Sequence, residues 1–164
     1  MTSASALREP LERLYREFDY GARIERDAIQ FPLRYADPRD REIVALLTSC
    51  LAYGRVDLFG RELGRVLLAM GDSPSRFVRD FDPRRDAERF AGFRYRFNRP
   101  PDLAAFCVAA RDLLARYGTL EKCFLAGDPD DRGPIGPALE YFARAFLEAD
   151  LGEVFPRRRL SRGY

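Results

Sequence analysis

The segment from Arg89 to Arg99 combines positive charge with aromatic rings in a way that suits nucleic-acid binding. It reads Arg-Phe-Ala-Gly-Phe-Arg-Tyr-Arg-Phe-Asn-Arg, with four arginines, four aromatic residues and no acidic residue. Guanidinium groups can neutralise phosphates, and aromatic side chains offer flat faces on which bases stack. We therefore take Arg94, Tyr95, Arg96 and Asn98 as candidate nucleic-acid contacts.

An extended conformation of this segment would separate its two kinds of side chain. Arg94 and Arg96 lie two residues apart, so they would share one face. The rings of Phe93, Tyr95 and Phe97 would lie on the opposite face. This geometry fits two interpretations. In one, arginines and rings contact nucleic acid together; in the other, the rings belong to the core and the arginines cover the surface, which is the commoner use of aromatic side chains.

A second candidate is the junction Leu51-Ala-Tyr-Gly-Arg-Val56, which separates two apolar helical segments. Gly54 allows the chain to turn sharply and to expose Tyr53 and Arg55 at the tip. An aromatic ring beside an arginine is suited to wedge into or stack on nucleic acid. The alternative interpretation is a glycine that ends a helix, with Tyr53 packed against that helix.

Missing residue types exclude several kinds of catalysis. The chain has no histidine, so it has no Ser-His-Asp or Cys-His nucleophile pair and no histidine metal ligand. Lys122 is the only lysine, and nothing near it in sequence would lower its pKa for Schiff-base chemistry. No glycine-rich phosphate-binding loop or dinucleotide fingerprint occurs.

The cysteines and the acidic loop give no sign of a metal or redox centre. Cys50, Cys107 and Cys123 are odd in number and far apart, which argues against a disulfide framework, a zinc site or an iron–sulfur cluster. Cys50 and Cys107 lie in apolar segments and are predicted to be buried. The loop Asp128-Pro-Asp-Asp131 lacks the spacing of a calcium loop. We expect no catalytic residue, no metal site and no cofactor.

Composition indicates an ordinary globular chain. Its 164 residues carry 28 basic and 26 acidic side chains, and 46% of the residues are hydrophobic. The net charge of +2 is low for a dedicated DNA-binding protein. No signal peptide is apparent, and the longest uncharged stretch, 43–54, is shorter than the ~20 residues that span a bilayer. We expect a soluble, cytoplasmic protein without membrane contact.

Helical periodicity dominates the elements that would position these residues. A helix from Pro38 to Tyr53 is apolar on most sides, so we expect it to be central and buried. Longer helices are predicted over 56–70 and 100–117, each closed by a glycine. Shorter helices are predicted after Ser73-Pro74, over 83–90 and over 119–124.

The two ends complete the predicted fold. A first helix begins near Pro10 and ends at Tyr20-Gly21, and a last helix is stopped by Gly152. The apolar stripes of these helices are Leu7, Leu11, Leu14 and Phe18 in the first, and Ile135, Leu139, Phe142 and Phe146 in the last. We predict an all-α orthogonal bundle of about six or seven helices. Residues 1–155 form one helical domain, and residues 156–164 form a basic tail or truncated connector.

Several stretches together resemble a bacterial family known as "domain of unknown function 2400". The resemblance covers most of residues 7–150, and Ala28 departs from it, because members commonly have proline there. Its most specific parts are Ala-Tyr-Gly at 52–54 and Phe-Arg-Tyr-Arg-Phe-Asn at 93–98. The stretches that carry it are Asp27-Ala-Ile-Gln-Phe-Pro-Leu-Arg-Tyr35, Asp40-Arg-Glu-Ile-Val-Ala-Leu-Leu-Thr-Ser-Cys-Leu-Ala-Tyr-Gly-Arg-Val56, Met70-Gly-Asp-Ser-Pro74, and Phe90-Ala-Gly-Phe-Arg-Tyr-Arg-Phe-Asn98 followed by Asp102-Leu.

That family is in turn similar to the helix–hairpin–helix DNA glycosylases. The resemblance implies a buried helix, a DNA-contacting junction at Tyr53, Gly54 and Arg55, a second helix, a loop and a long helix. Full-length members continue into an Asp-x-His motif whose aspartate corresponds to the glycosylase carboxylate. A chain without histidine cannot contain that motif, so we expect an N-terminal portion with the catalytic segment absent and the fold incomplete at its C-terminus.

Three functions remain open from the sequence. The first is a nucleic-acid-binding helical module, glycosylase-like in ancestry, with DNA as its partner. The second is a protein–protein or assembly module that associates with itself through apolar surface left uncovered near Phe142 and Phe146. The third is a stand-alone enzyme that would need a pair of carboxylates, and no such pair stands out in the sequence.

Overall fold

The computed structural model describes residues 4–128 and 134–155. Over these ranges the chain is all-α, as predicted, with nine α-helices, three short 3-10 helices and no β-sheet. The count exceeds six or seven because the chain before Pro38 and around residues 83–90 divides into several short pieces. The α-helices are α1 Ala4–Glu17, α2 Tyr20–Ile24, α3 Pro38–Leu51, α4 Val56–Met70, α5 Pro74–Arg79, α6 Pro83–Asp86, α7 Pro100–Tyr117, α8 Leu120–Leu125 and α9 Gly136–Leu147.

Local signals set where most helices begin. The side chains of Asp37, Ser73, Asp82 and Thr119 each accept a hydrogen bond from a backbone N–H in the first turn of the helix that follows. This satisfies amide groups that have no partner inside the helix. Proline follows the first three of these residues and fixes a φ angle suited to a first helical turn.

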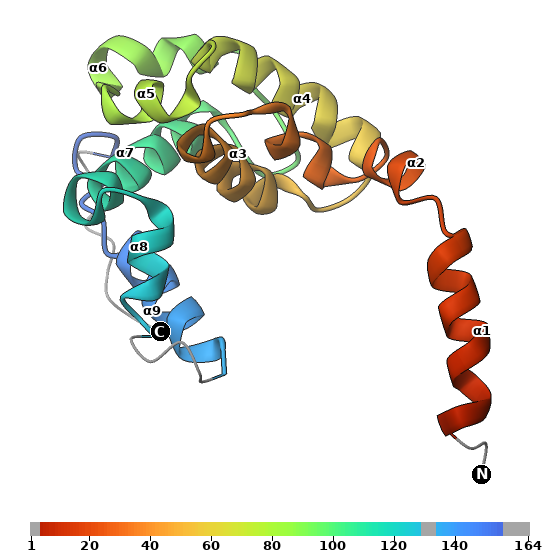
Figure 1. Ribbon diagram of the computed structural model, residues 1–164. Coiled ribbons are helices and arrows are strands. Elements are labelled where there is room, and N and C mark those ends of the chain that lie inside the picture. Colours follow the sequence, from red (N-terminus) through yellow and green to blue (C-terminus); the bar gives the residue numbers. More distant parts are fainter. Residues whose placement is uncertain (1–3, 129–133, 156–164) are drawn as a thin grey trace.

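The core lies around α3 and α7. Helix α3 packs against α4, α5 and α8, and α7 packs against α5, α8 and α9 (Figure 1). The predicted burial of α3 is confirmed for four side chains, whereas Cys50 is exposed rather than buried. It lies on the outer side of α3, in the last turn of that helix. The four buried side chains are Ile43, Val44, Leu47 and Leu51.

The last helix differs from its prediction. Helix α9 ends at Leu147 rather than near Gly152, and Ile135 and Leu139 are exposed. Phe142 and Phe146 are half-buried against the core. Their rings meet those of Phe124 and Phe106, at centroid distances of 6.4 and 5.8 Å respectively. The uncovered surface expected around these two phenylalanines is therefore largely covered by the chain itself.

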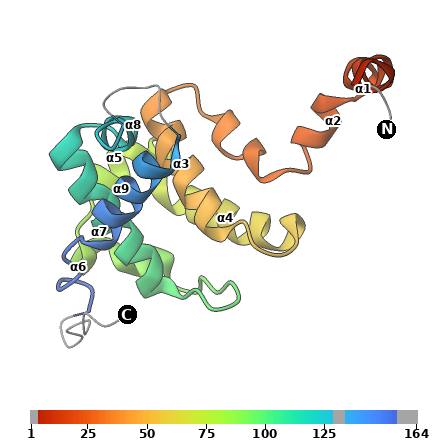
Figure 2. The ribbon, with the colours of Figure 1, turned by 90° about the horizontal axis from the view of Figure 1, so that it is seen from below.

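Helix α1 projects away from the rest of the molecule (Figures 1 and 2). It begins at Ala4 and continues through Pro10, so the predicted start at that proline is wrong. Its apolar stripe is uncovered: Leu11 and Leu14 are each 60% exposed. The Tyr20 ring of α2 lies against the rings of Tyr15 in α1 and Phe18 just after α1, at centroid distances of 5.6 and 4.9 Å.

The remaining sequence predictions concern the basic tail, the acidic loop, metal binding and membrane contact. The basic tail at 156–164 and most of the acidic loop at 128–131 lie outside the described residues. Within the ranges that are described, no cluster of histidine, cysteine and carboxylate side chains could hold a metal ion. None of the helices in that part of the chain is both long and apolar enough to cross a membrane.

Two carboxylates on α3 cap other helices. Asp40 is buried and accepts hydrogen bonds from the Ser75 N–H at 2.8 Å and the Ser73 hydroxyl at 3.0 Å, at the start of α5. Glu42 accepts from the N–H groups of Leu120 and Glu121, at 3.0 and 3.3 Å, at the start of α8. Each carboxylate satisfies amides at a helix N-terminus and meets the positive end of its dipole.

We expect Asp40→Ala to lower the free energy of unfolding by about 1–3 kcal/mol, because it leaves a buried N–H of α5 without a partner. Urea unfolding followed by circular dichroism measures this. The matched control is Glu140→Ala, which removes an exposed ion pair with Arg144 on α9 and should cost less than about 0.5 kcal/mol. An Asp40→Ala variant that unfolds at the same urea concentration as the parent would contradict the prediction.

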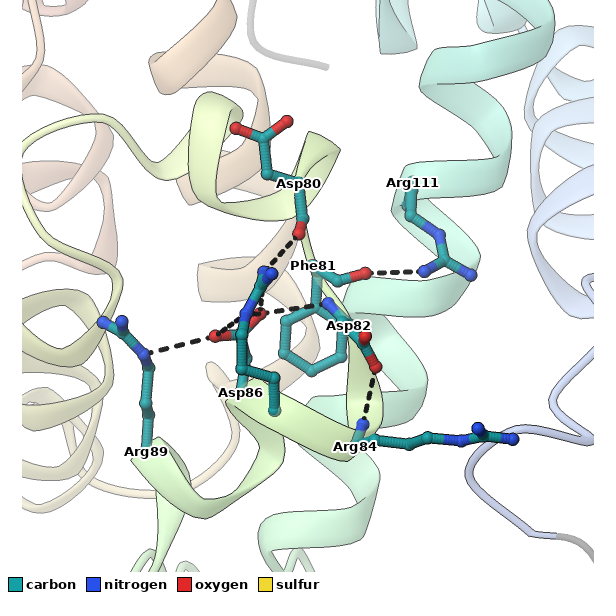
Figure 3. Close-up of polar contacts among 8 residues, drawn as sticks. Asp80, Phe81, Asp82, Arg84, Asp86, Arg89 and Arg111 are labelled. Atoms are coloured by element: carbon teal, nitrogen blue, oxygen red, sulfur yellow. Dashed lines mark hydrogen bonds and ion pairs between the residues drawn. The ribbon is translucent and has the colours of Figure 1, made fainter.

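A second buried carboxylate fixes the approach to the arginine-rich segment. Asp86 is 4% exposed and accepts hydrogen bonds from the Asp82 N–H and from the Arg85 side chain, and the Arg89 Nε lies 3.4 Å from one of its oxygens. Figure 3 shows Asp86 with Asp82 and Arg89 beside it. The hydrogen bonds from the Arg85 guanidinium hold the pKa of Asp86 below its usual value. Arg111 on α7 donates to the Phe81 carbonyl at 2.6 Å, which attaches the connection between α5 and α6 to α7.

The lowered pKa of Asp86 predicts a pH dependence of stability. The ionised carboxylate is favoured in the folded state, so its contribution is complete above the unfolded pKa of about 3.9 and is lost as pH falls through the lower folded pKa. We expect Asp86→Asn to be less stable than the parent at pH 7 and to lose less stability between about pH 4 and pH 2. Arg85→Gln should flatten the curve in the same way. Urea unfolding at several pH values measures this, and an Asp86→Asn curve parallel to the parent's would show that Asp86 does not contribute.

Candidate nucleic-acid interface

The junction between α3 and α4 is a tight four-residue turn. Helix α3 ends at Leu51, the Tyr53 N–H donates to the Leu51 carbonyl at 2.8 Å, and α4 begins at Val56. Gly54 has a φ of +93°, a conformation that L side chains rarely adopt. The helix therefore ends two residues earlier than predicted, and Gly54 serves the turn after the helix rather than the helix end itself.

The arginine–aromatic segment ends in a second tight turn. Tyr95 and Asn98 face each other as an isolated antiparallel bridge, with N–H to carbonyl distances of 3.2 and 2.8 Å. Arg96 and Phe97 form the tip of this turn. The loop that precedes α7 projects from the body of the molecule (Figure 2). Arg99 braces the turn by donating to the carbonyls of Arg96 and Asn98, at 2.7 and 2.8 Å.

The two turns contact each other directly. The Tyr53 hydroxyl donates to the side-chain oxygen of Asn98, and the Tyr95 hydroxyl donates to the Tyr53 carbonyl. The two tyrosine rings lie 5.2 Å apart, centroid to centroid. Arg96 lies over Gly54, so that a Cβ atom added to this glycine would come within 2.7 Å of the guanidinium Nη2. We call this combined surface, residues 53–55 and 94–98, the junction–turn surface.

The seven predicted contact residues have three different roles on this surface. Tyr95 is buried, while Tyr53 and Asn98 are half-buried and hydrogen-bonded, so these three hold the two turns together. Tyr53 is therefore less exposed than the sequence led us to expect. Gly54 has no side chain, which allows the Arg96 guanidinium to lie close to the backbone of the junction. The other three, Arg55, Arg94 and Arg96, are exposed and carry the positive charge.

The arginines differ in how far they are already paired. Arg55 forms a 2.7 Å ion pair with Asp57, and their hydrogen bonds raise the pKa of Arg55 and lower that of Asp57. Over the described part of the chain, Arg94 and Arg96 take part in no ion pair. Arg89, at the start of the arginine–aromatic segment, forms an ion pair with Asp86. The charge available to a ligand therefore lies mainly on Arg94 and Arg96.

The sequence pattern did not predict how far Phe97 is exposed. It placed Phe97 on one face with Phe93 and Tyr95 and left open whether these rings are buried or contact nucleic acid. Phe93 and Tyr95 are 6% and 5% exposed. Phe97 is instead 87% exposed at the tip of the turn. The alternation breaks at Arg96, whose φ of +48° reverses the chain. A two-residue turn with a positive φ on an arginine has no strong sequence signal, because glycine is the residue expected there.

A groove of about 580 Å³ adjoins the junction–turn surface on the side of Arg55. Three arginines and two acidic residues line it, together with Phe31 and Gly60. The Arg34 guanidinium lies 4.6 Å from the centroid of the Phe31 ring. The charged residues of this lining are Glu25, Arg26, Arg34, Arg55 and Asp57.

The comparison with known proteins gives one match. Residues 27–161 match the model of a family described as "Protein of unknown function (DUF2400)". No curated protein and no solved structure was found to match the chain significantly. The matched range contains both turns of the junction–turn surface, whereas α1 and α2 precede it. Because the match covers most of the sequence, this chain belongs to the DUF2400 family.

Proposed function

We propose that this chain binds nucleic acid, with DNA as its partner, through the junction–turn surface. The observation that carries the proposal is the contact between two segments singled out independently, through hydrogen bonds that join residues 45 and 42 positions apart in sequence. This contact joins the two turns that carry the exposed side chains of Arg55, Arg94 and Arg96. Such a cluster of guanidinium groups is suited to phosphate contacts.

The order of elements also supports a glycosylase-like mode of binding. The resemblance implies a buried helix, a short junction, a second helix, a loop and a long helix. The chain has these in the same order, as α3, the junction, α4, the projecting turn and α7, with α5 and α6 between α4 and the turn. Helix α4 begins directly after Arg55, and the amides of its first turn add partial positive charge there. We assign binding, and no catalytic step, to the residues of this chain.

The first test removes the two unpaired arginines. We expect Arg94→Ala combined with Arg96→Ala to weaken binding to duplex DNA about tenfold at low salt. The slope of log K against log salt should fall by about 1 for each phosphate that the variant no longer neutralises. Fluorescence anisotropy titrations at several salt concentrations measure both quantities. Alanine keeps the Cβ atom at position 96, so the turn carries a similar backbone strain in the variant.

The matched control removes the same charge elsewhere. Arg39 and Arg79 are exposed, at the first turn of α3 and the end of α5, away from the α3–α4 junction. Arg39→Ala combined with Arg79→Ala should leave DNA binding close to that of the parent. Equal weakening in both double variants would show that binding follows net charge alone. A parent that binds no DNA at low salt would end the proposal.

A second candidate function is self-association through α1, because its apolar stripe is uncovered. Three residues of the stripe, Leu11, Leu14 and Phe18, line a groove of about 730 Å³ along α1, together with Tyr15 and Tyr20. The helix carries three arginines and three glutamates, so a second copy is not repelled by net charge. This candidate moves the predicted association surface from Phe142 and Phe146, which are half-buried, to Leu7, Leu11, Leu14 and Phe18.

Sedimentation equilibrium tests this candidate. We expect the parent to form dimers, and we expect Leu11→Asp combined with Leu14→Asp to make it monomeric, because charges cannot be buried between two apolar stripes. Both side chains are exposed in the single chain, so the fold should be unaffected. Glu9→Gln combined with Arg13→Gln, on the polar face of α1, is the control. A parent that stays monomeric at high concentration would exclude the candidate.

A further inference from the structure

The turn at 95–98 holds an arginine in a conformation that normally calls for glycine. Arg96 has a φ of +48° and is the only non-glycine residue with a positive φ in the described ranges. A positive φ at the first central residue of a two-residue turn is the type II′ pattern, in which glycine is favoured at that position. The strain at Arg96 persists because the surrounding contacts determine the turn.

Three side chains make those contacts. The Tyr53 hydroxyl holds the Asn98 side chain, the Tyr95 hydroxyl holds the Tyr53 carbonyl, and Arg99 holds two carbonyls of the turn. Tyr95 is itself anchored in the core, with its ring 6.4 Å from that of Phe59, centroid to centroid. The turn is therefore fixed to the body of the protein at both of its ends.

The consequence of this fixed turn is the display of one aromatic ring. Phe97 is 87% exposed, the highest value among the exposed large hydrophobic side chains of the described residues. Leaving a phenylalanine ring in water forgoes the free energy of its burial. A braced, strained turn that presents such a ring is explained if the ring is buried against a ligand.

The charges around Phe97 indicate the chemistry of that ligand. Arg94 and Arg96 precede Phe97 by three residues and by one residue, and no acidic residue occurs between Arg89 and Pro101. An apolar protein pocket would match the ring but leave these guanidinium groups without partners. A nucleic acid matches both, because a base offers a flat face to the ring and its phosphates are within reach of neighbouring arginines.

We propose that Phe97 stacks on an unpaired or unstacked base of the bound nucleic acid, while Arg94 and Arg96 contact the adjacent phosphates. The ligand is a single strand or a duplex that opens at one base step. This inference rests on the proposed function and adds to it the contact that distinguishes a base from a mere polyanion. Tyr53 and Tyr95 position the turn and do not stack on the base.

The experiment uses the absence of tryptophan from the chain. Phe97→Trp introduces a single tryptophan at the tip of the turn, and stacking on a base quenches indole fluorescence. We expect quenching by a thymidine oligonucleotide, and also by a mixed-sequence duplex if the ring enters a base step. Heparin, a polyanion without bases, should bind the arginines without quenching the fluorescence.

A binding measurement accompanies the fluorescence. Phe97→Ala should weaken binding to the oligonucleotide about 5- to 150-fold, without changing the salt slope, because it removes a stacking contact and no charge. Phe97→Tyr should restore most of the affinity. Leu68→Ala is the matched control, since Leu68 is 84% exposed on α4, in a turn distant from the junction, and should have no effect.

The outcomes separate this inference from the proposed function. Binding that depends on Arg94 and Arg96, but with no quenching of Phe97→Trp and no weakening in Phe97→Ala, would overturn the stacking role and leave the proposed function in place. Equal quenching by heparin would also overturn it. A parent that binds neither oligonucleotide nor duplex at low salt would overturn both.

Discussion

The hydrogen bonds accepted by Asp40 and Glu42 connect α3 to helices that lie much further along the chain. Asp40 holds an amide 35 positions away and Glu42 one 78 positions away. A buried carboxylate is costly unless its oxygens are hydrogen-bonded, and unpaired amides at a helix N-terminus are costly in the same way. Each carboxylate and the amide that it binds therefore satisfy one another. These hydrogen bonds fix α3 relative to the first turns of α5 and α8.

The same helix leads into the junction–turn surface at its other end. Because α3 is fixed at its N-terminal half and buried along one side, the junction that follows Leu51 leaves the core at a defined point. Tyr53 and Tyr95 then join the two turns by two hydroxyl hydrogen bonds and by the contact between their rings. Polar groups held in this way set a single geometry, since a shift of either turn leaves a half-buried hydroxyl unpaired.

Sequence patterns predicted the elements whose signals are local. Helices α4 and α7 begin and end where the apolar periodicity and the flanking glycines place them, and the caps at Asp37 and Ser73 act within a few residues of their own positions. The contact of Asp40 with α5 lies outside such patterns, because it depends on how distant helices pack. The predicted burial of Cys50 is wrong for the same reason: an apolar segment does not show which side of its helix meets the core.

The candidate site was indicated by the sequence, since arginine beside aromatic rings is a local pattern. Its division into positioning and exposed residues was not, because that depends on the contact between two distant turns. Phe97 shows the limit most clearly: its exposure follows from the φ of Arg96, which only the braced turn sustains.

Overall charge gives a poor guide to what such a surface can bind. The net charge of +2 arises from nearly equal numbers of acids and bases, but screening restricts each charge to about 8 Å at physiological ionic strength. A phosphate at the turn is therefore affected by Arg94 and Arg96 far more than by the distant acids. Arg55 attracts a phosphate less strongly, because it forms an ion pair with Asp57. A chain that is almost neutral as a whole can thus bind a polyanion at one tip, provided that its fold brings unpaired arginines together there.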